Sequence, residues 1–351
     1  MTTSAEQVLT DFICCARPLR RALLLMVVFA AGCGAGSRDV ATFRGGVMGT
    51  QYTVRAVLPA GADADLLARL VRETLQDIDG KMSTYKPDSE LSRFNAAPAN
   101  EPFPLSPETA GVFRTALEIS RESGGAFDLT VGPLVNAWGF GPEDPPEPPS
   151  DAEIEALLGR IGHQHLELRG DGTVVKDIEG LYCDLSAIAK GYAVDCVAKA
   201  LGAAGVSACM VEVGGEVQTR GAKPGGIPWT IGIEKPVIGE RRLHGVLELT
   251  GGALASSGGY RNFHEVDGRR VSHTIDPRTG RPVTHSLTAV SVLHDACARA
   301  DAYATTLMVL GPERGAAFCA AHGIAALFFL RGEDGGYTTR ATEGFPELAR
   351  R

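Results

Sequence analysis

The residues most suggestive of chemistry lie in the segment Ala300–Thr306, whose sequence is ADAYATT. In a helix, Asp301 and Thr305 stand at positions i and i+4 and share one face. A carboxylate beside hydroxyl or carbonyl oxygens suits a hard cation such as Mg²⁺, which keeps several waters and needs few protein ligands. A carboxylate near a helix N-terminus also complements the helix dipole without any metal, so both interpretations stay open.

A second candidate is the sequence DLSAIAKGY at residues 184–192. Asp184 is a plausible N-cap for a helix that begins directly after it. Lys190 would then lie about two turns into that helix, close enough to its N-terminus to help hold an anion such as a phosphate. An ordinary exposed lysine would give the same pattern.

Three further segments offer ligand-binding or acid–base groups. Tyr85 ends the loop MSTY, where its ring could stack on a planar ligand or simply be a half-buried loop residue. Glycines bracket Phe127 and Asp128, which lets backbone approach a ligand closely. His273 precedes the turn sequence DPRTG; it is a candidate acid or base, although a purely structural turn explains that composition equally well.

Composition excludes several classes of protein. The chain has 351 residues, of which 44% are hydrophobic and 22% charged, as in a folded globular protein rather than a disordered or polytopic membrane protein. Its 34 basic and 42 acidic residues leave a net charge of −8, so we expect no nucleic-acid partner. The eight cysteines form no CxxC pair, which argues against a zinc site or a disulfide framework.

The N-terminus is typical of a targeting segment. A basic cluster, Arg17, Arg20 and Arg21, precedes a short aliphatic run over residues 22–31 that is too short to span a bilayer. The tetrad AAGC at residues 30–33 resembles a bacterial lipobox. We therefore predict a lipoprotein signal peptide over 1–32, lipidation of Cys33, a tether over 33–41 and a membrane-anchored, exported protein facing the periplasm. An ordinary cleaved signal with a chance cysteine is the alternative.

Together these segments indicate one site with glycine-rich walls, a helix end suited to phosphate and an oxygen cluster suited to Mg²⁺. No Walker loop, GxSxG or HExxH motif is present, so the enzyme classes that these motifs mark are not supported. We expect a reaction at a nucleotide phosphate, carried out outside the cytosol.

Helices and strands must position these groups, and their predicted order is irregular. Periodicity and caps predict helices over 63–81, 107–122 (with Ser106 as N-cap), 185–201, 298–310 and 313–321. Strands are predicted over 51–58, 207–217, 228–235, 243–250, 286–294 and 325–330. A proline-rich loop covers 141–150, and helix-forming sequence resumes at Asp151. Several strands are adjacent with short turns, which favours an α+β fold with a mostly antiparallel sheet and packed helices.

Seven segments resemble motifs of the ApbE family in order and spacing: MGT, MSTY…SELSRFN, GAFDLTVGPLVNAWGFG, DLSAIAKGYAVD, VEVGGE, ASSGGYRNF…HTIDPRTG and ADAYATTLMVLG. The resemblance covers roughly Thr42 to Leu330. It implies an ApbE-like, T-fold-like domain over 42–345, a single structure with two lobes around an FAD cleft. Members of this family are FAD:protein FMN transferases, often exported lipoproteins.

The resemblance also implies roles for particular residues. The FAD-contacting set is Met48, Tyr85, Ala126, Phe127, Asp128, Asp184, Lys190 and Ile275. The metal set is Ala187 through its carbonyl, Asp301, and Thr305 with the adjacent Ala304. Many relatives have Thr where this chain has Ala187, so one hydroxyl ligand is lost here. Asp301 and His273 are the two candidates for accepting the proton of the acceptor hydroxyl, and the sequence does not choose between them.

The implied reaction is a Mg²⁺-dependent transfer of FMN from FAD to a Thr or Ser hydroxyl of a flavoprotein, with release of AMP. The implied acceptors are subunits of the sodium-pumping NADH:quinone reductase, of the related Rnf complex, or other exported flavin-carrying domains. Two alternatives remain open at this point: a Mg²⁺-dependent FAD pyrophosphatase, in which water replaces the hydroxyl, and a non-catalytic FAD-binding lipoprotein.

Overall fold

The computed structural model describes residues 40–142, 147–237, 242–259, 263–266, 269–332 and 336–349. These residues belong to one structural unit, Ser37–Arg351. The predicted signal peptide and Cys33 lie outside the described residues, as does most of the predicted tether. Among the residues described, no helix has both the length and the apolar character needed to cross a bilayer.

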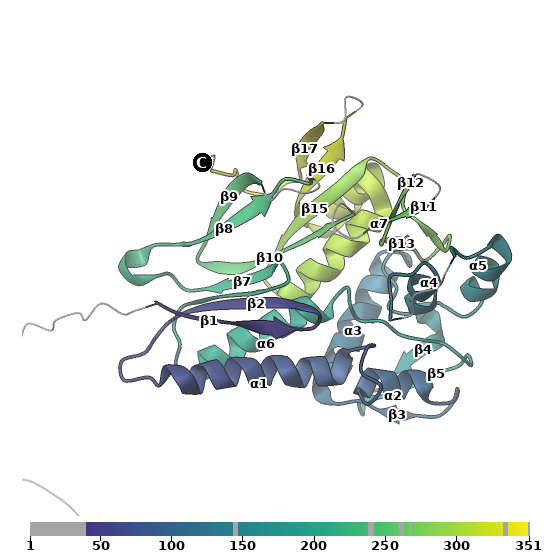
Figure 1. The fold of residues 1–351 in the computed structure, drawn as a ribbon, viewed down its shortest axis with the longest axis horizontal. Helices are drawn as coiled ribbons and strands as arrows, with labels where there is room; N and C mark the ends of the chain where they lie inside the picture. Colours follow the sequence, from purple (N-terminus) through teal and green to yellow (C-terminus); the bar gives the residue numbers. More distant parts are fainter. Residues whose placement is uncertain are drawn as a thin grey trace, which may run out of the picture. The chain divides into compact units, whose positions relative to one another are not determined.

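An eight-stranded sheet organises this unit (Figure 1). Every neighbouring pair in it is antiparallel. In spatial order its strands are β1 (Val40–Val47), β2 (Thr50–Val57), β6 (Cys209–Val213), β7 (Glu216–Arg220), β10 (Gly251–Gly258), β15 (Leu287–His294), β16 (Ala325–Arg331) and β17 (Tyr337–Ala341). The predicted α+β class with a mostly antiparallel sheet is confirmed.

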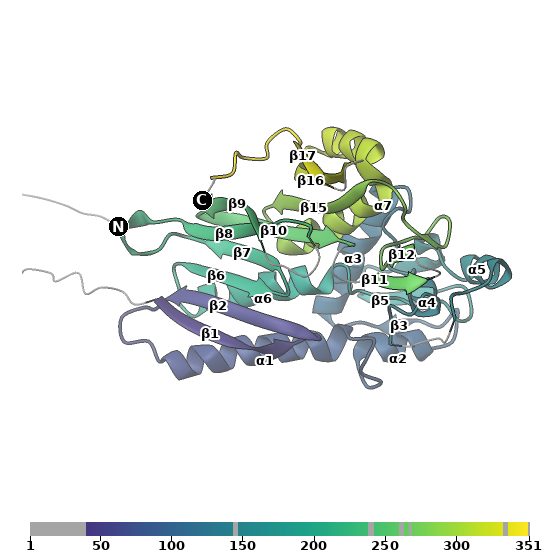
Figure 2. The ribbon, with the colours of Figure 1, turned by 45° about the horizontal axis from the view of Figure 1, so that its top comes forward.

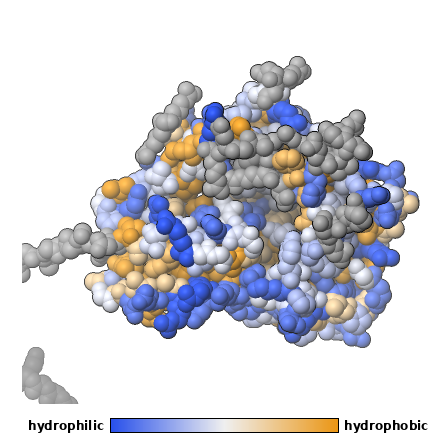
Figure 3. Space-filling view, in the orientation of Figure 1, coloured by the Kyte–Doolittle hydropathy of each residue, from blue (hydrophilic) through white to orange (hydrophobic). Residues whose placement is uncertain are grey.

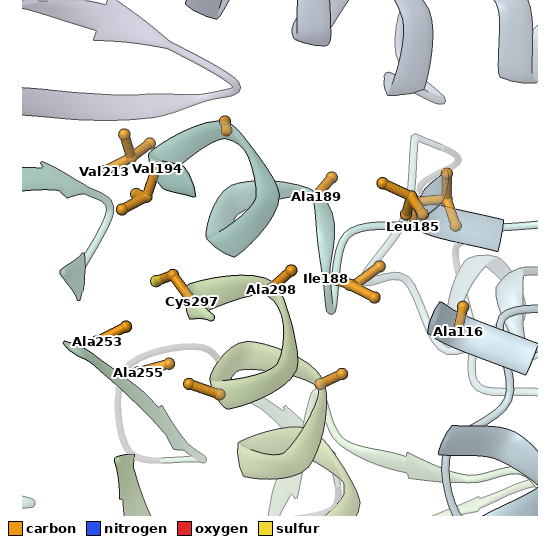
Figure 4. Close-up of a cluster of buried hydrophobic side chains, with 14 of the residues drawn as sticks. Ala116, Leu185, Ile188, Ala189, Val194, Val213, Ala253, Ala255, Cys297 and Ala298 are labelled. Atoms are coloured by element: carbon orange, nitrogen blue, oxygen red, sulfur yellow. The ribbon is translucent and has the colours of Figure 1, made fainter. Parts of the chain in front are cut away.

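Three helices cover one face of this sheet: α1 (Ala64–Met82), α6 (Ala189–Ala203) and α7 (Cys297–His322). Alternate side chains of the strands meet them, among them Val213, Ala253 and Ala255, to form the main hydrophobic core (Figure 4). Small residues dominate where α6 and α7 meet the sheet, so these helices lie close to it. The outer side of α1 is charged and forms part of the blue lower rim in Figure 3.

A hairpin of β8 (Trp229–Glu234) and β9 (Leu243–Leu249) packs on the opposite face of the sheet (Figure 2). Its residues Ile231 and Leu247 join Leu254 and Phe329 in a second apolar cluster. The outer edge of β9 is held by the chain end, because Val246 and Ala349 exchange two backbone hydrogen bonds of 3.0 Å. The buried sheet residues of this cluster come from β7, β10, β15 and β16, so the hairpin covers only part of that face.

The remaining elements gather beside the sheet. The helices are α2 (Glu90–Ala96), α3 (Pro107–Glu122), α4 (Gly132–Ala137) and α5 (Asp151–Leu158). A small sheet contains β3 (Phe103–Pro104), β5 (Thr173–Lys176) and β4 (Leu166–Leu168), and two further pairs are β11 (Phe263–Val266) with β12 (Arg269–Ser272) and β13 (Ile275–Asp276) with β14 (Arg281–Pro282). Single-turn 3₁₀ helices cover His163–His165 and Pro224–Gly226.

Several predicted boundaries are confirmed. Helix α1 begins after Asp63, whose carboxylate accepts hydrogen bonds from the N–H groups of Asp65 and Leu66 in the first turn. Helix α3 spans the predicted residues with Ser106 as its N-cap. Strand 51–58, the hairpin strands 228–235 and 243–250, and strands 286–294 and 325–330 all occur within about two residues of the expected ends.

Two predictions about elements were wrong. The strand predicted over 207–217 is two strands, β6 and β7, because Gly214 and Gly215 both take positive φ and form a two-residue turn. The helix predicted over 185–201 begins only at Ala189, after a turn. By contrast, the two helices predicted over 298–310 and 313–321 are confirmed as the two parts of α7, which are separated at Gly311, whose φ of +75° is non-helical, and Pro312.

The crossing of α6 and α7 depends on one glycine. A Cβ on Gly191 would lie 2.4 Å from the carbonyl oxygen of Cys297 and 2.8 Å from the Cα of Ala298. Both atoms belong to the backbone of α7, so neither can rotate away.

We therefore expect Gly191→Ala to destabilise the protein by about 1–3 kcal/mol through overpacking, despite the better helix propensity of alanine. Gly111→Ala in α3 is the matched control, since a Cβ there meets nothing within 4 Å, and it should stabilise by roughly 0.5–1 kcal/mol. Chemical denaturation of both variants measures this, and equal effects would contradict the account.

Candidate functional site

A cavity of about 1200 Å³ lies beside the sheet. Of the catalytic, FAD-contacting and metal residues proposed from the sequence, all except Met48 and Ala304 line it. Those that do are Tyr85, Ala126, Phe127, Asp128, Asp184, Ala187, Lys190, His273, Ile275, Asp301 and Thr305. They come from segments far apart in the chain, so the fold brings the separate motifs to one place.

Three charged side chains form the centre of this cavity. The Nζ of Lys190 lies 3.6 Å from Oδ2 of Asp301 and 3.6 Å from Oε1 of Glu216. The two carboxylates are almost fully buried, while the lysine keeps about a quarter of its side chain exposed (27%). Lys190 also donates a 3.0 Å hydrogen bond to the carbonyl of Ser186, which points its ammonium group at the two acids.

Backbone geometry fixes each member of this centre. Asp195 on α6 accepts hydrogen bonds from the N–H groups of Cys297 and Ala298, at 2.8 and 3.0 Å, and so caps the start of α7. The N–H of Gly191 donates to Oδ2 of Asp301 at 3.1 Å, which ties the carboxylate to the neighbouring helix. Glu216 follows the tight Gly214–Gly215 turn that begins β7.

Burial and mutual charge perturb these groups. Burial alone would lower the pKa of Lys190, but Asp301 and Glu216 outweigh it and raise that pKa above its ordinary 10.5. Burial and the charge of Asp301 raise the pKa of Glu216 to about 8, although Lys190 opposes them. Two acids share one base here, so an additional cation would relieve the excess negative charge.

The donor set fits a small hard cation. Among the described residues, Oε2 of Glu216 is a buried oxygen without a hydrogen-bond partner, and a bound ion or water is one explanation for such an atom. The described residues contain no group of three or more His, Cys, Asp and Glu that could hold a metal. A cation here would therefore use two carboxylates, a hydroxyl such as that of Thr305, carbonyl oxygens and waters, the coordination typical of Mg²⁺.

Asp128, one of the predicted FAD-contacting residues, accepts several hydrogen bonds from within the protein. Asp128 accepts hydrogen bonds from the N–H and hydroxyl of Thr130, at 2.9 and 2.7 Å, and from the N–H of His163 at 2.8 Å. Its buried carboxylate thereby holds the loop that presents Ala126 and Phe127 to the cavity. Asp128 therefore shapes the wall of the site in addition to lining it.

Tyr85 and His273 are more exposed to solvent than the buried acids Glu216 and Asp301. The Tyr85 side chain is 68% exposed, which leaves its ring available for stacking at the edge of the cavity. Partial burial and the nearby charge of Asp184 raise the pKa of its hydroxyl. His273 is half-buried between β12 and β13, with its ring centroid 6.2 Å from that of Phe140 in an edge-on arrangement.

The structure corrects two expectations in the 184–192 segment. Asp184 does not cap α6; its carboxylate accepts a 2.7 Å hydrogen bond from the N–H of Ser186 within the preceding turn, and the N-cap position is Ile188. Lys190 accordingly lies in the first turn of α6 rather than two turns into it. Lys190 therefore lies near a helix N-terminus, as predicted, but the charged groups next to it are two carboxylates.

Met48 and Ala304 do not line the cavity. Met48 sits in the β1–β2 turn with φ of +50°, next to Gly49, which does line it. Ala304 is fully buried in α7. Sequence reasoning also missed Glu216: the motif VGGE was noted, but only the Gly-Gly turn, with its two positive φ angles, reveals that the next side chain enters the site.

Comparison with known proteins identifies the family. The model of the ApbE family matches residues 48–328, and the chain belongs to this family. It is 43% identical to the FAD:protein FMN transferase of Vibrio cholerae over 314 residues, which covers 89% of this chain and 93% of the relative. It is 39% identical over 329 residues to the protein of that name from Escherichia coli K12, covering 90% and 93%.

Solved structures agree with this assignment. The flavin transferase ApbE of Vibrio cholerae superposes with a TM-score of 0.81 at 42% identity, covering 88% of this chain and 98% of the other. The apo form of the flavinyl transferase ApbE of Pseudomonas stutzeri gives 0.80 at 42% identity, with coverage of 87% and 95%. Sequence and fold thus point to the same family over nearly the whole described chain.

The raised pKa of Glu216 predicts a pH-dependent stability. Because the folded-state pKa of about 8 exceeds the ordinary 4.5, the folded protein binds this proton more tightly than the unfolded chain does. The stabilisation is complete below about pH 4.5 and is lost as the pH rises through 8.

In Mg²⁺-free buffer, the Tm of Glu216→Gln should therefore rise relative to that of wild type between pH 5 and 9. Glu248→Gln, which changes an exposed carboxylate on β9, should follow wild type throughout. Thermal unfolding at each pH measures this, and a Glu216→Gln curve parallel to that of wild type would show that Glu216 titrates normally.

Proposed function

We propose that this protein is a Mg²⁺-dependent FAD:protein FMN transferase that modifies a Thr or Ser hydroxyl of an acceptor flavoprotein and releases AMP. The observation that carries the proposal is the Lys190–Glu216–Asp301 centre inside a cavity large enough for a dinucleotide. Membership of the ApbE family and the names of the relatives support the same reaction.

The transfer needs no covalent enzyme intermediate. The acceptor oxygen forms a bond to the phosphorus of the FMN moiety, the bond from that phosphorus to the bridging oxygen breaks, and AMP leaves with this oxygen. The hydroxyl proton passes to a base. Positioning and charge neutralisation dominate such phosphoryl-type reactions, and Lys190 supplies a fixed positive charge near the pyrophosphate.

Mg²⁺ bound at this centre would neutralise pyrophosphate oxygens and improve AMP as a leaving group. Asp301, Thr305 and the Ala187 carbonyl would hold it, since all three residues line the cavity. Ala304 is buried and could take part only through its backbone. Glu216 adds a second carboxylate next to Lys190, and its unpartnered oxygen supports its inclusion in this set.

The proton acceptor is best assigned to His273. Asp301 already accepts a hydrogen bond from Gly191 and faces the ammonium of Lys190, so it is a poor base and a good cation ligand. His273 lines the same cavity and has an imidazole suited to proton transfer near neutral pH.

The proposal also includes the location of the protein in the cell. The lipobox-like tetrad before Cys33 supports an exported lipoprotein that faces the periplasm. Acceptors would then be exported flavin-carrying domains, including those of the sodium-pumping NADH:quinone reductase and Rnf complexes. Labelling with a radioactive fatty acid tests the anchor, since Cys33→Ser should abolish incorporation if Cys33 is lipidated.

One experiment separates transfer from its alternatives. The mature protein is incubated with FAD, Mg²⁺ and an exported acceptor domain, and in-gel flavin fluorescence is read together with free nucleotides. Covalent fluorescence on the acceptor supports the transferase. Free FMN and AMP without labelled acceptor would indicate a pyrophosphatase, and unchanged FAD would indicate a binding protein.

In this assay Asp301→Ala should lower labelling by roughly 10²–10³-fold, because charge stabilisation at the reacting phosphate is lost, while FAD binding is weakened only partly. Asp295→Ala is the matched control, since Asp295 is exposed just before α7 and does not line the cavity. Labelling by Asp301→Ala at the wild-type rate would contradict the assignment of Asp301.

A further inference from the structure

The cavity lining comes from two separate parts of the fold that meet at the Lys190–Glu216–Asp301 centre. One part contains Tyr85, Phe127 and Ile275, the residues suited to a flavin nucleotide. The other, which we call the sheet arm, is lined by Gln51, Thr53, Met210, Glu212, Thr230 and Gly232. Pockets for a single small ligand usually enclose about 300–1000 Å³, whereas this one reaches about 1200 Å³.

The floor of the sheet arm is the outer face of β2 and β6. Tyr52 and Val54 point to the helices and are buried in the main core, so Thr53 between them points to the other side. The same alternation places Met210 and Glu212 on the outer face of β6. The β8–β9 hairpin, which packs over β7, β10, β15 and β16, leaves these outward residues accessible to the cavity.

The wall of the sheet arm is an unpaired strand edge. Among the described residues, β8 pairs with β9 alone. Val246 of β9 exchanges both of its backbone hydrogen bonds with Ala349, on the side away from β8. Its cross-strand partner Gly232 is therefore in a non-hydrogen-bonded pair, and the N–H and C=O of Gly232 point away from β9.

The register extends this pattern along β8. Thr230 lies two residues before Gly232 and pairs with Glu248 without a break in register, so its N–H and C=O point the same way. Both Thr230 and Gly232 are exposed and line the cavity. An exposed strand edge of this kind is a template for pairing with another chain.

This edge lines the same cavity as the reacting centre. Val217 follows Glu216 on β7, and its side chain packs with Ile231 of β8 in one apolar cluster. A polypeptide paired along β8 would therefore run past the Glu216 side of the centre. The sheet arm offers polar side chains and backbone groups on its floor and wall, which suits an extended peptide better than a planar nucleotide ring.

We propose that the acceptor flavoprotein docks here by strand addition: an extended segment pairs with the free edge of β8 at Thr230 and Gly232 and delivers its Thr or Ser hydroxyl to the Lys190–Glu216–Asp301 centre. This inference rests on the proposed transferase function. It assigns FAD and the acceptor to different parts of one cavity, so that the phosphate and the hydroxyl meet between them.

Three variants test the docking, with transfer kinetics measured separately for acceptor and FAD. Gly232→Pro removes an outward N–H that β9 does not use, and should raise the KM for the acceptor roughly 5-fold. Thr230→Trp should raise it at least about 10-fold by filling the sheet arm. Glu248→Trp is the matched control, because Glu248 faces Thr230 on the hairpin but does not line the cavity, and it should change neither KM.

FAD affinity and Tm, measured on each variant, show whether the fold and the nucleotide site are intact. A second measurement uses wild-type enzyme and acceptor peptides N-methylated at single positions, which remove one backbone donor without touching the enzyme. Methylation at alternate positions of the segment should weaken transfer, and methylation at the intervening ones should not.

An unchanged acceptor KM in Gly232→Pro and Thr230→Trp would overturn the proposal, as would an equal effect of methylation at every position. Loss of FAD affinity in Thr230→Trp with an unchanged acceptor KM would mean that the sheet arm holds the nucleotide, and would overturn it too. Failure of the proposed function is distinguishable, because wild type itself would then label no acceptor.

Discussion

The contact between α6 and α7 is the constraint on which the site depends. Asp195 of α6 caps the start of α7. Gly191 lets the backbones of the two helices come so close that a Cβ at this position would collide with the backbone of α7. The same approach brings the N–H of Gly191 to Asp301. Because a buried carboxylate needs hydrogen bonds to remain charged, the packing of two helices also sets the chemistry of the cavity.

The charge balance of the centre follows from that packing. One lysine faces two buried acids, an arrangement whose stability improves when a further cation or a proton is present. In the proposed function the acids would hold the Mg²⁺, and the cation together with Lys190 would attract the phosphate. The Gly214–Gly215 turn contributes the second acid from the sheet.

Many features of the fold and the site could be predicted from the sequence, because they depend only on residues that are near one another in the chain. Asp301 and Thr305 share a helical face whatever surrounds them, and the caps of α1 and α3 are set by short-range contacts. Glu216 could not be predicted, because its position depends on a turn inside a run that resembles one long strand. Strand β10, with the sequence GGALASSG, is not predicted from the sequence because its small residues have little strand propensity.

The Lys190–Glu216–Asp301 centre is proposed to transfer FMN from FAD to a protein hydroxyl. The most direct test is mass spectrometry of an acceptor domain after reaction with the mature enzyme, FAD and Mg²⁺, with AMP quantified in the same sample. We expect one site-specific FMN adduct on a Thr or Ser, and AMP in an amount equal to the adduct. AMP formed together with free FMN and unmodified acceptor would contradict it.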